Sequence, residues 1–271
     1  MKKGPESSSV KANVDQWSNV ADEYDRFRPE PPGELVDLLT QLARVEKPSV
    51  VIDLGCGTGL ATRVWENSAA QVIGIEPNDD MRILAEAQTA SSHISFRPGY
   101  GHDTGLPDNC ADIVTAAHSL HWMEPESTVS EIDRILRRGG VFAQVDFKWP
   151  MTIDWEITLA IHRAKQRCTA IIDELNLRKE RRYSTSKHFE LLRSRTTFRF
   201  TDELALTRIQ SGSAPQIIGL LKTHQDFRQA LDYGMSEDEL GLSEVSQVAE
   251  RVMGDGSRPW FLYFRVRVAV K

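Results

Sequence analysis

Short apolar runs alternate with more polar, helix-like stretches through the first half of the chain. The apolar runs predict five β-strands, at 49–55, 71–78, 93–99, 111–119 and 141–147. The stretches between them predict helices, at 61–69, 79–90 and 125–136, the last of them stopped by Gly139 and Gly140. Such alternation is typical of a parallel α/β sheet with helices on both of its faces.

The chain before the first strand has a different pattern. Residues 1–13 are polar and contain few apolar positions, so we expect a disordered tail there. Apolar positions then recur at helical spacing, at Trp17, Val20, Ala21 and Tyr24. A proline-rich break at 29–32 separates this stretch from a second helix at 34–44. We expect these helices to form an N-terminal cover of an α/β domain that spans 14–147.

The alternation ends after Trp149. Pro150 excludes a continuing central strand, and the pattern over 154–179 predicts one long amphipathic helix. The stretch 178–192 is too polar to belong to a hydrophobic core. We therefore expect residues 148–194 to form a helical lid that is inserted after the fifth strand.

The last part of the chain returns to strands. A strand is predicted near 196–200, and helices are predicted near 216–233 and 243–253. The alternation from Arg265 to Val268 favours an antiparallel strand with one solvated face over a parallel strand buried on both faces. Residues 195–271 are thus expected to hold the last strands of the sheet, with helical lid elements between them over about 205–255.

Composition and charge narrow the class of protein. The chain has 271 residues, of which 40% are hydrophobic and 27% charged, as in a globular protein with a full core. The 33 Lys and Arg residues against 39 Asp and Glu give a net charge of −6, which disfavours binding to a nucleic-acid backbone. No stretch approaches the roughly 20 apolar residues that span a bilayer. We therefore expect neither a nucleic acid nor a membrane as a partner.

Cysteine usage and the opening residues indicate a cytoplasmic protein. Cys56, Cys110 and Cys168 are odd in number and widely spaced, so they match neither a disulfide framework nor a zinc site, and we expect no metal. The opening residues, MKKGPESSSV, contain two lysines but no apolar run, so they do not form a secretory signal. A cytoplasmic enzyme or small-molecule binder is the class that remains.

The most specific chemical feature lies at the end of the first predicted strand. The sequence VIDLGCGTG over 51–59 places three alternating glycines after an apolar strand. Glycines let the backbone turn tightly and approach a ligand without Cβ atoms in the way. A phosphate-binding P-loop needs Gly-Lys-Ser/Thr, which is missing, and Leu60 occupies the last glycine position of a dinucleotide fingerprint. The loop is therefore predicted to bind a ligand that lacks a pyrophosphate.

A single acid ends the second predicted strand. Glu76 follows Asp53 of the first strand by 23 positions. A carboxylate in that place can accept hydrogen bonds from both hydroxyl groups of a ribose, as it does in dinucleotide folds. With the glycine loop upstream, the binding role is favoured over that of a solvated acid at a strand end.

These features resemble the class I S-adenosylmethionine-dependent methyltransferases, in particular the small-molecule group of methyltransferase type 11 and trans-aconitate methyltransferase-like proteins. The resemblance covers roughly 15–147 and is carried by YDRFRP (24–29), VIDLGCGTGLAT (51–62), VIGIEPNDDM (72–81), TGLPDNCADIVTAAHSLHW (104–122) and ILRRGGVFA (135–143). It implies a Rossmann-like fold, a doubly wound and mostly parallel seven-stranded sheet with an antiparallel C-terminal strand and a helical lid. It also implies transfer of a methyl group from S-adenosylmethionine to a small-molecule acceptor by O-, N- or C-methylation, with a carboxylate or a secondary metabolite among the possible acceptors.

The resemblance further implies a set of cofactor-binding residues. Tyr24 and Arg28 would cover the cofactor, and Arg28 would pair with a carboxylate of either the cofactor or the substrate. The other implied cofactor residues are Asp53, Gly55, Cys56, Gly57, Glu76, Pro77, Met81, Gly101, His102, Asp103, Ala117 and His118. Relatives commonly carry an acid where His102 stands, so Asp103 is the alternative partner for the adenine amino group.

A histidine pair follows the fourth predicted strand, where doubly wound folds open their ligand crevice. His121 is the candidate catalytic residue, because an imidazole titrates near neutral pH and suits the removal of a proton from the acceptor. Alignment of donor and acceptor can also suffice without a base, because the sulfonium is already activated. The residues expected to contact the acceptor are Tyr24, His121, Trp122 and Trp149.

Other functions fit parts of the same pattern. A non-catalytic S-adenosylmethionine-binding protein would keep the loop, and a nicotinamide-dependent oxidoreductase would use a similar one, although the missing third glycine argues against it. An RNA methyltransferase would need basic grooves and an accessory module, whereas the one dense basic cluster, RKERR at 178–182, is interpreted as a solvated helix end. Both a monomer and a homo-oligomer are compatible with the sequence.

Overall fold

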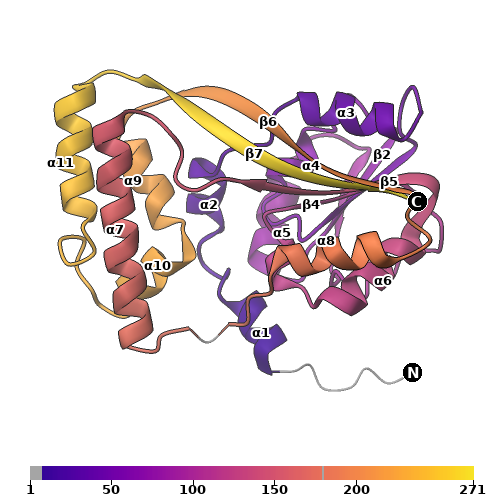
Figure 1. Ribbon diagram of the computed structural model, residues 1–271, viewed down its shortest axis with the longest axis horizontal. Helices are drawn as coiled ribbons and strands as arrows, with labels where there is room; N and C mark the ends of the chain where they lie inside the picture. The colour runs from indigo at the N-terminus through magenta and orange to yellow at the C-terminus, as the bar shows by residue number, and fades with distance from the viewer. Residues whose placement is uncertain (1–7, 179) are drawn as a thin grey trace.

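The computed structural model describes residues 8–178 and 180–271 (Figure 1). Its strands are β1 (Val50–Leu54), β2 (Gln71–Ile75), β3 (Ile94–Arg97), β4 (Ala111–Ala117), β5 (Leu136–Phe147), β6 (Phe200–Gly212) and β7 (Arg258–Val270). They form one seven-stranded sheet in the order β3-β2-β1-β4-β5-β7-β6. Strands β1 to β5 pair in parallel, whereas β7 is antiparallel to both β5 and β6. The predicted doubly wound, mostly parallel sheet with an antiparallel C-terminal strand is confirmed.

Helices cover both faces of this sheet. They are α1 (Ser8–Asp15), α2 (Ala21–Phe27), α3 (Glu34–Leu42), α4 (Leu60–Arg63), α5 (Asp79–Ala87), α6 (Pro125–Ile135), α7 (Trp155–Glu174), α8 (Thr185–Ser194), α9 (Ala214–Lys222), α10 (Gln225–Asp232) and α11 (Leu242–Met253). Successive strand residues point to opposite faces, so the buried side chains fall into two clusters. Val51 belongs to one cluster with Leu39 of α3, and Ile52 belongs to the other with Ile132 of α6.

The strand order reverses between β1 and β4. Strand β1 pairs with β2 on one side and with β4 on the other, so the connections after β1 and β4 leave the sheet in different directions. A crevice opens at the carboxyl ends of the strands at such a reversal, and ligands of open α/β sheets bind there. The glycine loop after β1 and the histidine segment after β4 both border this crevice.

Helices α7, α9, α10 and α11 form a separate group at one end of the molecule, to which the long strands β6 and β7 extend (Figure 1). These two strands pair over their full lengths, from Phe200 with Val270 to Gly212 with Arg258. Buried side chains such as Ile161 of α7 join the core cluster of the sheet. Among the residues that the structure describes, none of the helices combines the length and apolar character of a membrane span.

The N-terminal region differs from the expected disordered tail. Residues 8–15 form helix α1, and residues 1–7 lie outside the described part of the chain. Side-chain hydrogen bonds hold this helix, because the amide of Asn13 donates to the backbone oxygens of Trp122 and Arg181, each at 2.9 Å. Both partners lie more than a hundred positions away in the sequence. The prediction was wrong because tertiary contacts of this kind override weak local propensity.

Two predicted boundaries in the sheet are also wrong. Helix α6 ends at Ile135, and β5 begins directly at Leu136 and runs through both glycines, whereas the sequence predicts a strand only from 141. Strand β6 covers Phe200–Gly212, where the sequence predicts a short strand near 196–200 and then a lid. Strand β6 lies at the edge of the sheet and exposes one face, so its polar sequence carries little strand signal and pairing with β7 stabilises it.

Three predicted helical segments change their extent. The helix expected at 61–69 is limited to α4, which ends at Arg63. The single helix expected at 216–233 divides into α9 and α10 at His224. The polar stretch 178–192 includes the first turns of α8, whose side chains Phe189 and Leu192 are buried against the α6 face of the sheet. That stretch is therefore partly core, contrary to the prediction.

Candidate functional site

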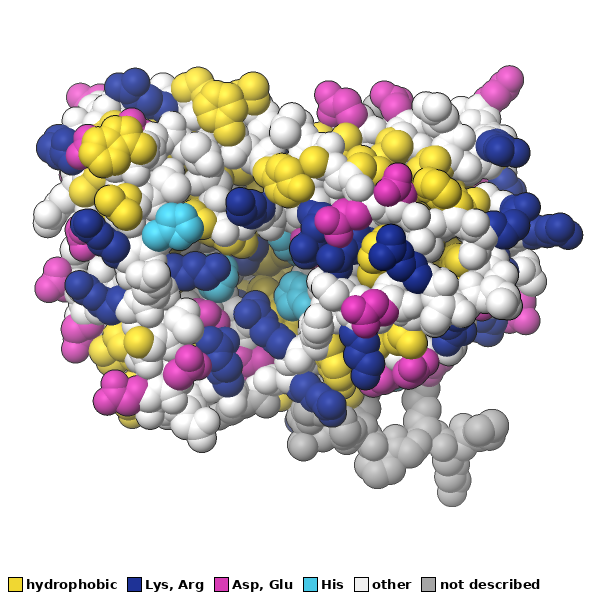
Figure 2. Space-filling view, viewed as in Figure 1, with side chains coloured by type: hydrophobic (Ala, Val, Ile, Leu, Met, Phe, Trp, Pro, Cys, Tyr) yellow, Lys and Arg dark blue, Asp and Glu magenta, His cyan; other side chains and the backbone are white. Residues whose placement is uncertain are grey.

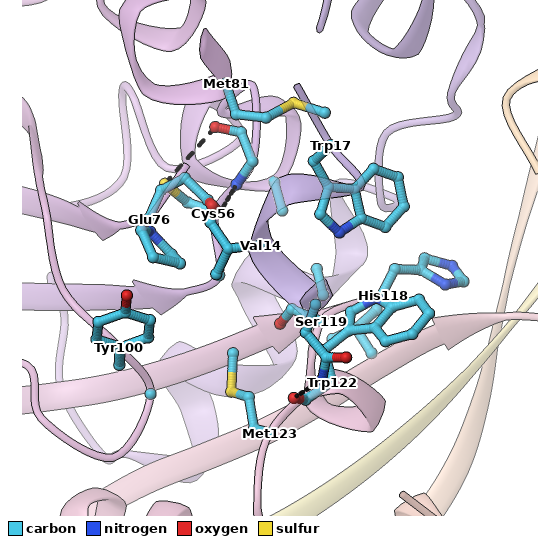
Figure 3. Close-up of a pocket in the computed structure, with 18 of the residues that line it drawn as sticks. Val14, Trp17, Cys56, Glu76, Met81, Tyr100, His118, Ser119, Trp122 and Met123 are labelled. Carbon is cyan, nitrogen blue, oxygen red and sulfur yellow. Dashed lines mark hydrogen bonds between the residues drawn. The ribbon is translucent and has the colours of Figure 1, made fainter. Parts of the chain in front are cut away.

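A first cavity, of about 470 Å³, lies in the crevice at the carboxyl ends of β1, β2 and β4. Its volume falls within the range of small-molecule sites, roughly 300–1,000 Å³. Glu76 and Tyr100 border one side of it, and Trp17 and Trp122 border the opposite side (Figure 3). The structure brings together in its lining most of the predicted cofactor residues: Tyr24, Arg28, Gly55, Cys56, Gly57, Glu76, Pro77, Met81, Gly101, His102, Ala117 and His118.

The glycine loop borders the first cavity with its backbone. A Cβ atom at Gly55 would lie 2.6 Å from the Cβ of Ser119, so only glycine fits there without a shift of β4 or the segment after it. Gly57 has a φ of +56°, and a Cβ at this position would meet no atom within 4 Å. Gly55 therefore serves close packing, whereas Gly57 leaves its backbone open to a ligand.

Glu76 is the charged group at the centre of the first cavity. Its side chain is 7% exposed, and its carboxylate accepts the backbone N–H groups of Gly57 and Asn78, both at 2.9 Å. Burial raises its pKa from 4.5 to about 7, and the two N–H groups oppose part of that rise. Each oxygen keeps lone pairs beyond these bonds, so the carboxylate can still accept from hydroxyl groups of a ligand. A buried carboxylate with a perturbed pKa in a cavity is typical of a functional site.

Asp53 lies behind the glycine loop and is not among the residues that line the first cavity, so its role toward the cofactor stays a prediction. It is fully buried, and its carboxylate accepts the hydroxyl groups of Thr62 at 2.8 Å and Thr115 at 2.9 Å. Burial raises its pKa to about 6, while the two hydroxyl groups lower it. Because Thr62 belongs to α4 and Thr115 to β4, Asp53 ties both elements to the end of β1 and supports the glycine loop from behind.

The segment after β3 forms another side of the first cavity. The rings of Tyr100 and His102 stack with centroids 5.4 Å apart, and Gly101 between them lines the cavity as well. Asp103 lies next to the lining residue His102 and is not itself among the lining residues, and its contact with the cofactor stays a prediction. Its backbone exchanges two hydrogen bonds with Tyr100, at 3.0 and 3.1 Å, and thereby holds this turn in place.

Helix α1 covers the first cavity, although the sequence predicts part of it as a disordered tail. Its residues and those that follow contribute Val10, Asn13, Val14 and Trp17 to the lining. Asn78 at the start of α5 donates its amide to the backbone oxygen of Val14 at 3.1 Å. The indole of Trp17 makes edge contacts with Tyr24 and Trp122, at centroid distances of 5.4 and 6.0 Å. The sequence predicts the cover from residue 14 onward, and what it misses is the part that Val10 and Asn13 contribute.

A second cavity, of about 420 Å³, shares a wall with the first. The two cavities have in common the residues Trp17, Tyr24, Arg28, His118, Trp122, Phe147 and Tyr183. All four residues predicted to contact an acceptor line the second cavity: Tyr24, His121, Trp122 and Trp149. Sequence reasoning missed the remaining lining residues, Asp146, Arg182, Ser184, Thr185, His224, Gln225 and Arg265. Figure 2 shows a hollow between the helical group and the sheet, with Lys, Arg and His side chains around its rim.

His118, which lines both cavities, and His121, which lines the second, are neutral at pH 7. His118 has a φ of +54°, and its Nε2 accepts the backbone N–H of Phe147 at 2.6 Å. Burial lowers its pKa well below the ordinary value of 6.5. Burial also lowers the pKa of His121 to about 3, with the charges of Arg182 and Arg28 adding to the effect. The expectation that His121 titrates near neutrality is therefore wrong, whereas its contact with an acceptor stays a prediction.

Arg28 lies in the wall between the two cavities. One of its Nη atoms donates to the backbone oxygen of Thr223 at 2.8 Å. Its guanidinium lies over the rings of Tyr24, at 5.0 Å, and Trp149, at 5.6 Å. Within residues 8–178 and 180–271, no carboxylate forms an ion pair with it. The side chain is thus available to a carboxylate of a ligand from either cavity.

The first cavity suits a nucleoside with an uncharged aromatic base and no phosphate. Glu76 offers acceptor capacity for hydroxyl groups, and Pro77 and Met81 offer apolar surface beside it. The hydroxyl of Thr58 is buried, lines the cavity and has no hydrogen-bond partner among the described residues. Among residues 8–178 and 180–271, the lining of this cavity contains no lysine of the kind a P-loop uses for a pyrophosphate. The adenosine part of S-adenosylmethionine fits these requirements.

Comparison with known proteins places this site in a family. Residues 52–144 match the methyltransferase domain family. The S-adenosylmethionine-dependent methyltransferase CRG1 of Saccharomyces cerevisiae, so named, is 32% identical over 144 residues, which are 51% of this chain and 49% of that protein. A methyltransferase of Mycobacterium tuberculosis is 34% identical over 118 residues, which are 43% of this chain and 46% of that protein. The chain spans about half the length of these curated relatives.

Solved structures share the fold at lower identity. A type II methyltransferase of Anaeromyxobacter dehalogenans, so named, aligns with a TM-score of 0.66 and 22% identity, over 90% of this chain and 97% of that one. The cyclase SpnF aligns with a TM-score of 0.53 and 18% identity, over 97% and 96% of the two chains. These likenesses concern the fold alone. The region that matches the methyltransferase domain family, residues 52–144, contains the glycine loop and Glu76, so the similarity to S-adenosylmethionine-dependent methyltransferases covers this part of the first cavity.

Proposed function

We propose that this chain transfers the methyl group of S-adenosylmethionine to a small-molecule acceptor, with the cofactor in the first cavity and the acceptor in the second. The observation that carries the proposal is the wall that the two cavities share, which includes Tyr24, His118 and Trp122. The two cavities adjoin, since seven residues line both of them, so ligands bound in them would be neighbours. Alignment of the reacting atoms is the main requirement of a transfer from an activated donor.

The cofactor is proposed to be held by groups of the first cavity. Glu76 accepts hydrogen bonds from the ribose hydroxyls, and the open backbone at Gly57 admits the chain of the methionine part. Met81, which is 2% exposed, and Pro77 pack against the adenine. When bound, S-adenosylmethionine supplies an electrophilic methyl group on a sulfonium centre. Asp53 acts as a positioning residue, because it orients the glycine loop and does not line the cavity.

The acceptor side is proposed to exclude water and to orient the acceptor. Helix α1 covers the first cavity, and the amide of Asn13 ties it to residues 122 and 181 on the other side of the crevice. Trp122 and Trp149 line the second cavity and reduce the polarity around the acceptor. Neutral His121 orients the acceptor by accepting or donating a hydrogen bond, and it is too weak a base to take a proton from an alcohol.

The test has a binding arm and a transfer arm. In the binding arm, calorimetry with S-adenosylhomocysteine should show that Glu76→Ala weakens binding at least about tenfold, since a hydrogen bond to a charged group contributes roughly 1.5–3 kcal/mol. Glu86→Ala, on the exposed side of α5, is the matched control and should bind like the original chain. In the transfer arm, the chain is incubated with methyl-labelled S-adenosylmethionine and a small-molecule extract, and labelled products are separated by chromatography.

The two arms separate the proposed enzyme from its alternatives. Unchanged affinity in Glu76→Ala would contradict the assignment of the first cavity to the cofactor. Cofactor binding without label in any product would instead favour a non-catalytic S-adenosylmethionine-binding protein. That alternative is a real one, because the same fold is found in a cyclase and does not by itself specify methyl transfer.

A further inference from the structure

The second cavity carries a surplus of positive charge. Arg28, Arg182 and Arg265 line it, and Asp146 is the one carboxylate among its lining residues. Arg265 lies 3.7 Å from Asp146, whereas neither Arg28 nor Arg182 has an ion-pair partner in the part of the chain that the structure describes. The nearby Asp226 is already paired with Arg178, at 2.9 Å. Neither arginine therefore has a direct ion-pair partner among the described residues, and Asp226 and Glu180 act on Arg182 only as nearby charges.

The histidines of the second cavity do not add to its positive charge, and the charges of Arg28 and Arg182 repel each other. Burial lowers the pKa of His121 to about 3 and that of His118 well below 6.5, and it lowers the pKa of His224 despite the opposing charge of Asp226, so all three are neutral at pH 7. The charge of Arg182 lowers the pKa of Arg28, after the larger effect of burial. Arg28 is partly buried, which makes the repulsion by Arg182 costly, and an anion between the two would relieve that cost.

Several polar atoms around the second cavity have no hydrogen-bond partner among the described residues. Gln225 is 2% exposed, and neither atom of its amide is paired. The Nε atoms of Arg28 and Arg265 and the Nε1 atom of Trp122 are further unpaired donors. Buried polar groups of folded proteins are nearly always paired, so unpaired ones around a cavity point to a ligand as their partner. Four donors and one acceptor call for a ligand rich in acceptor oxygens.

Aromatic rings form much of the remaining wall of this cavity. The rings of Phe147 and Trp149 lie with centroids 5.1 Å apart, and those of Trp17 and Trp122 lie 6.0 Å apart. The guanidinium of Arg28 lies over Trp149 at 5.6 Å, and that of Arg182 lies over Trp122 at 4.9 Å. A guanidinium that stacks on a ring keeps its N–H edge for a carboxylate. The rings themselves favour a planar aromatic partner.

We propose that the acceptor of the second cavity is an aromatic carboxylic acid, with its carboxylate held by Arg28, Arg182 and Gln225 and its ring against Trp149. The inference rests on the proposed function and deepens it by naming the class of acceptor. A neutral aromatic compound would offer the two arginines no carboxylate to bind. An aliphatic acid would offer no ring to pack against the aromatic side chains of the cavity. At about 420 Å³ the cavity has room for an acid of one or two rings.

The test measures the binding of three probes to the full chain saturated with S-adenosylhomocysteine. Benzoate carries both ring and charge, benzamide keeps the ring without the charge, and cyclohexanecarboxylate keeps the charge without the aromatic ring. Ligand-observed NMR titrations give the three dissociation constants. Benzoate should bind at least about tenfold more tightly than benzamide, because charge-assisted hydrogen bonds are the stronger ones. It should bind about three- to tenfold more tightly than cyclohexanecarboxylate, because ring-to-ring contacts add to simple burial.

Two variants test the assigned contacts, and both affect residues that line the second cavity only. Arg182→Gln should weaken benzoate about tenfold and bring it near benzamide, since Arg182 lies at the exposed rim and its loss does not disturb the core. Trp149→Leu should weaken benzoate about threefold more than it weakens cyclohexanecarboxylate. Arg163→Gln is the matched control, because the Arg163 side chain is 61% exposed on α7 and does not line the cavity.

The outcomes separate this inference from the proposed function. Binding of S-adenosylhomocysteine is measured first by calorimetry on every protein, and failure of the unaltered chain to bind it would contradict the proposed function. Suppose that S-adenosylhomocysteine binds and that benzamide or cyclohexanecarboxylate binds as tightly as benzoate. The proposal that the acceptor is an aromatic carboxylic acid is then overturned, whereas the proposed function is not. The absence of saturable benzoate binding has the same consequence, and so does an Arg182→Gln variant that binds benzoate as well as Arg163→Gln does.

Discussion

The Glu76→Gln variant without ligand should become more stable relative to the original chain as the pH rises. It should also bind the cofactor less tightly. The carboxylate is 7% exposed, and burial raises its pKa from 4.5 to about 7. At a pH between these two pKa values, Glu76 is protonated in the native state and ionised in the unfolded state. The original protein therefore loses stability as the pH rises through this interval. An amide in place of the carboxylate does not titrate, so the Glu76→Gln variant is free of that loss.

The size of this effect follows from the interval between the two pKa values. Each pH unit over which only the native state is protonated lowers the free energy of unfolding by about 1.4 kcal/mol, so the whole interval amounts to about 3 kcal/mol. From about pH 5 to about pH 8.5, Glu76→Gln should gain about 2–3 kcal/mol relative to the original chain. The amide has one acceptor for the two N–H groups of Gly57 and Asn78, which costs about 1–3 kcal/mol. That cost is the same at both pH values and cancels in the comparison.

The assay is urea unfolding followed by tryptophan fluorescence at the two pH values, without ligand. Glu86→Gln, on the exposed side of α5, removes a carboxylate from the same helix region and should run parallel to the original chain. If Glu76→Gln also runs parallel to it, Glu76 ionises at its ordinary pKa and the reasoning from burial is refuted. The expected result would instead show that a destabilising carboxylate is kept for binding, a common compromise at functional sites.

Three further predictions concern the loop, the histidine and the cover. Gly57→Val should abolish S-adenosylhomocysteine binding while thermal unfolding stays cooperative, because the Cβ position borders the cavity; normal binding in calorimetry would show that the loop is only a turn. The imidazole of His121 should stay neutral from about pH 5 to about pH 9, since its pKa is lowered to about 3, and an inflection in an NMR titration over that range would contradict this. Hydrogen exchange over 8–30 and 150–195 should slow on S-adenosylhomocysteine binding by more than in β5, and equal protection would remove these segments from the cover.

The parallel strands and the cofactor side of the site follow from local sequence. Parallel strands are buried on both faces, so β1, β2 and β4 stand out as short apolar runs without any knowledge of their partners. The carboxyl ends of such strands meet at one edge of the sheet. Placing Gly57 and Glu76 in one cavity therefore required only the positions of the strands. Their joint position is what the sequence predicts, and their role toward the cofactor remains a prediction.

Elements whose stability depends on distant partners were not predictable in the same way. Helix α1 has few apolar residues, and Asn13 holds it through partners at residues 122 and 181. Strand β6 exposes one face and is stabilised by full-length pairing with β7. Asp53 was placed at the ligand because it ends β1 beside the glycines. The hydroxyl groups that bury it come from Thr62 and Thr115, which no local pattern connects to it.

The second cavity lies almost wholly outside what the family pattern covers. The matched region, 52–144, contains the glycine loop and Glu76, whereas Arg28, Trp149, Arg182 and Gln225 lie before or after it. These residues come from α2, the segment after β5, the approach to α8 and the start of α10. The glycine loop and Glu76 of the first cavity thus lie in the matched region, whereas most residues that line the second cavity lie in the segments attached to it. Function resides in sites rather than in folds. Relatives that match only half of this chain are therefore informative about the proposed cofactor site in the first cavity, and not about the acceptor. The acceptor has to be determined from the charges and rings of this chain's own second cavity.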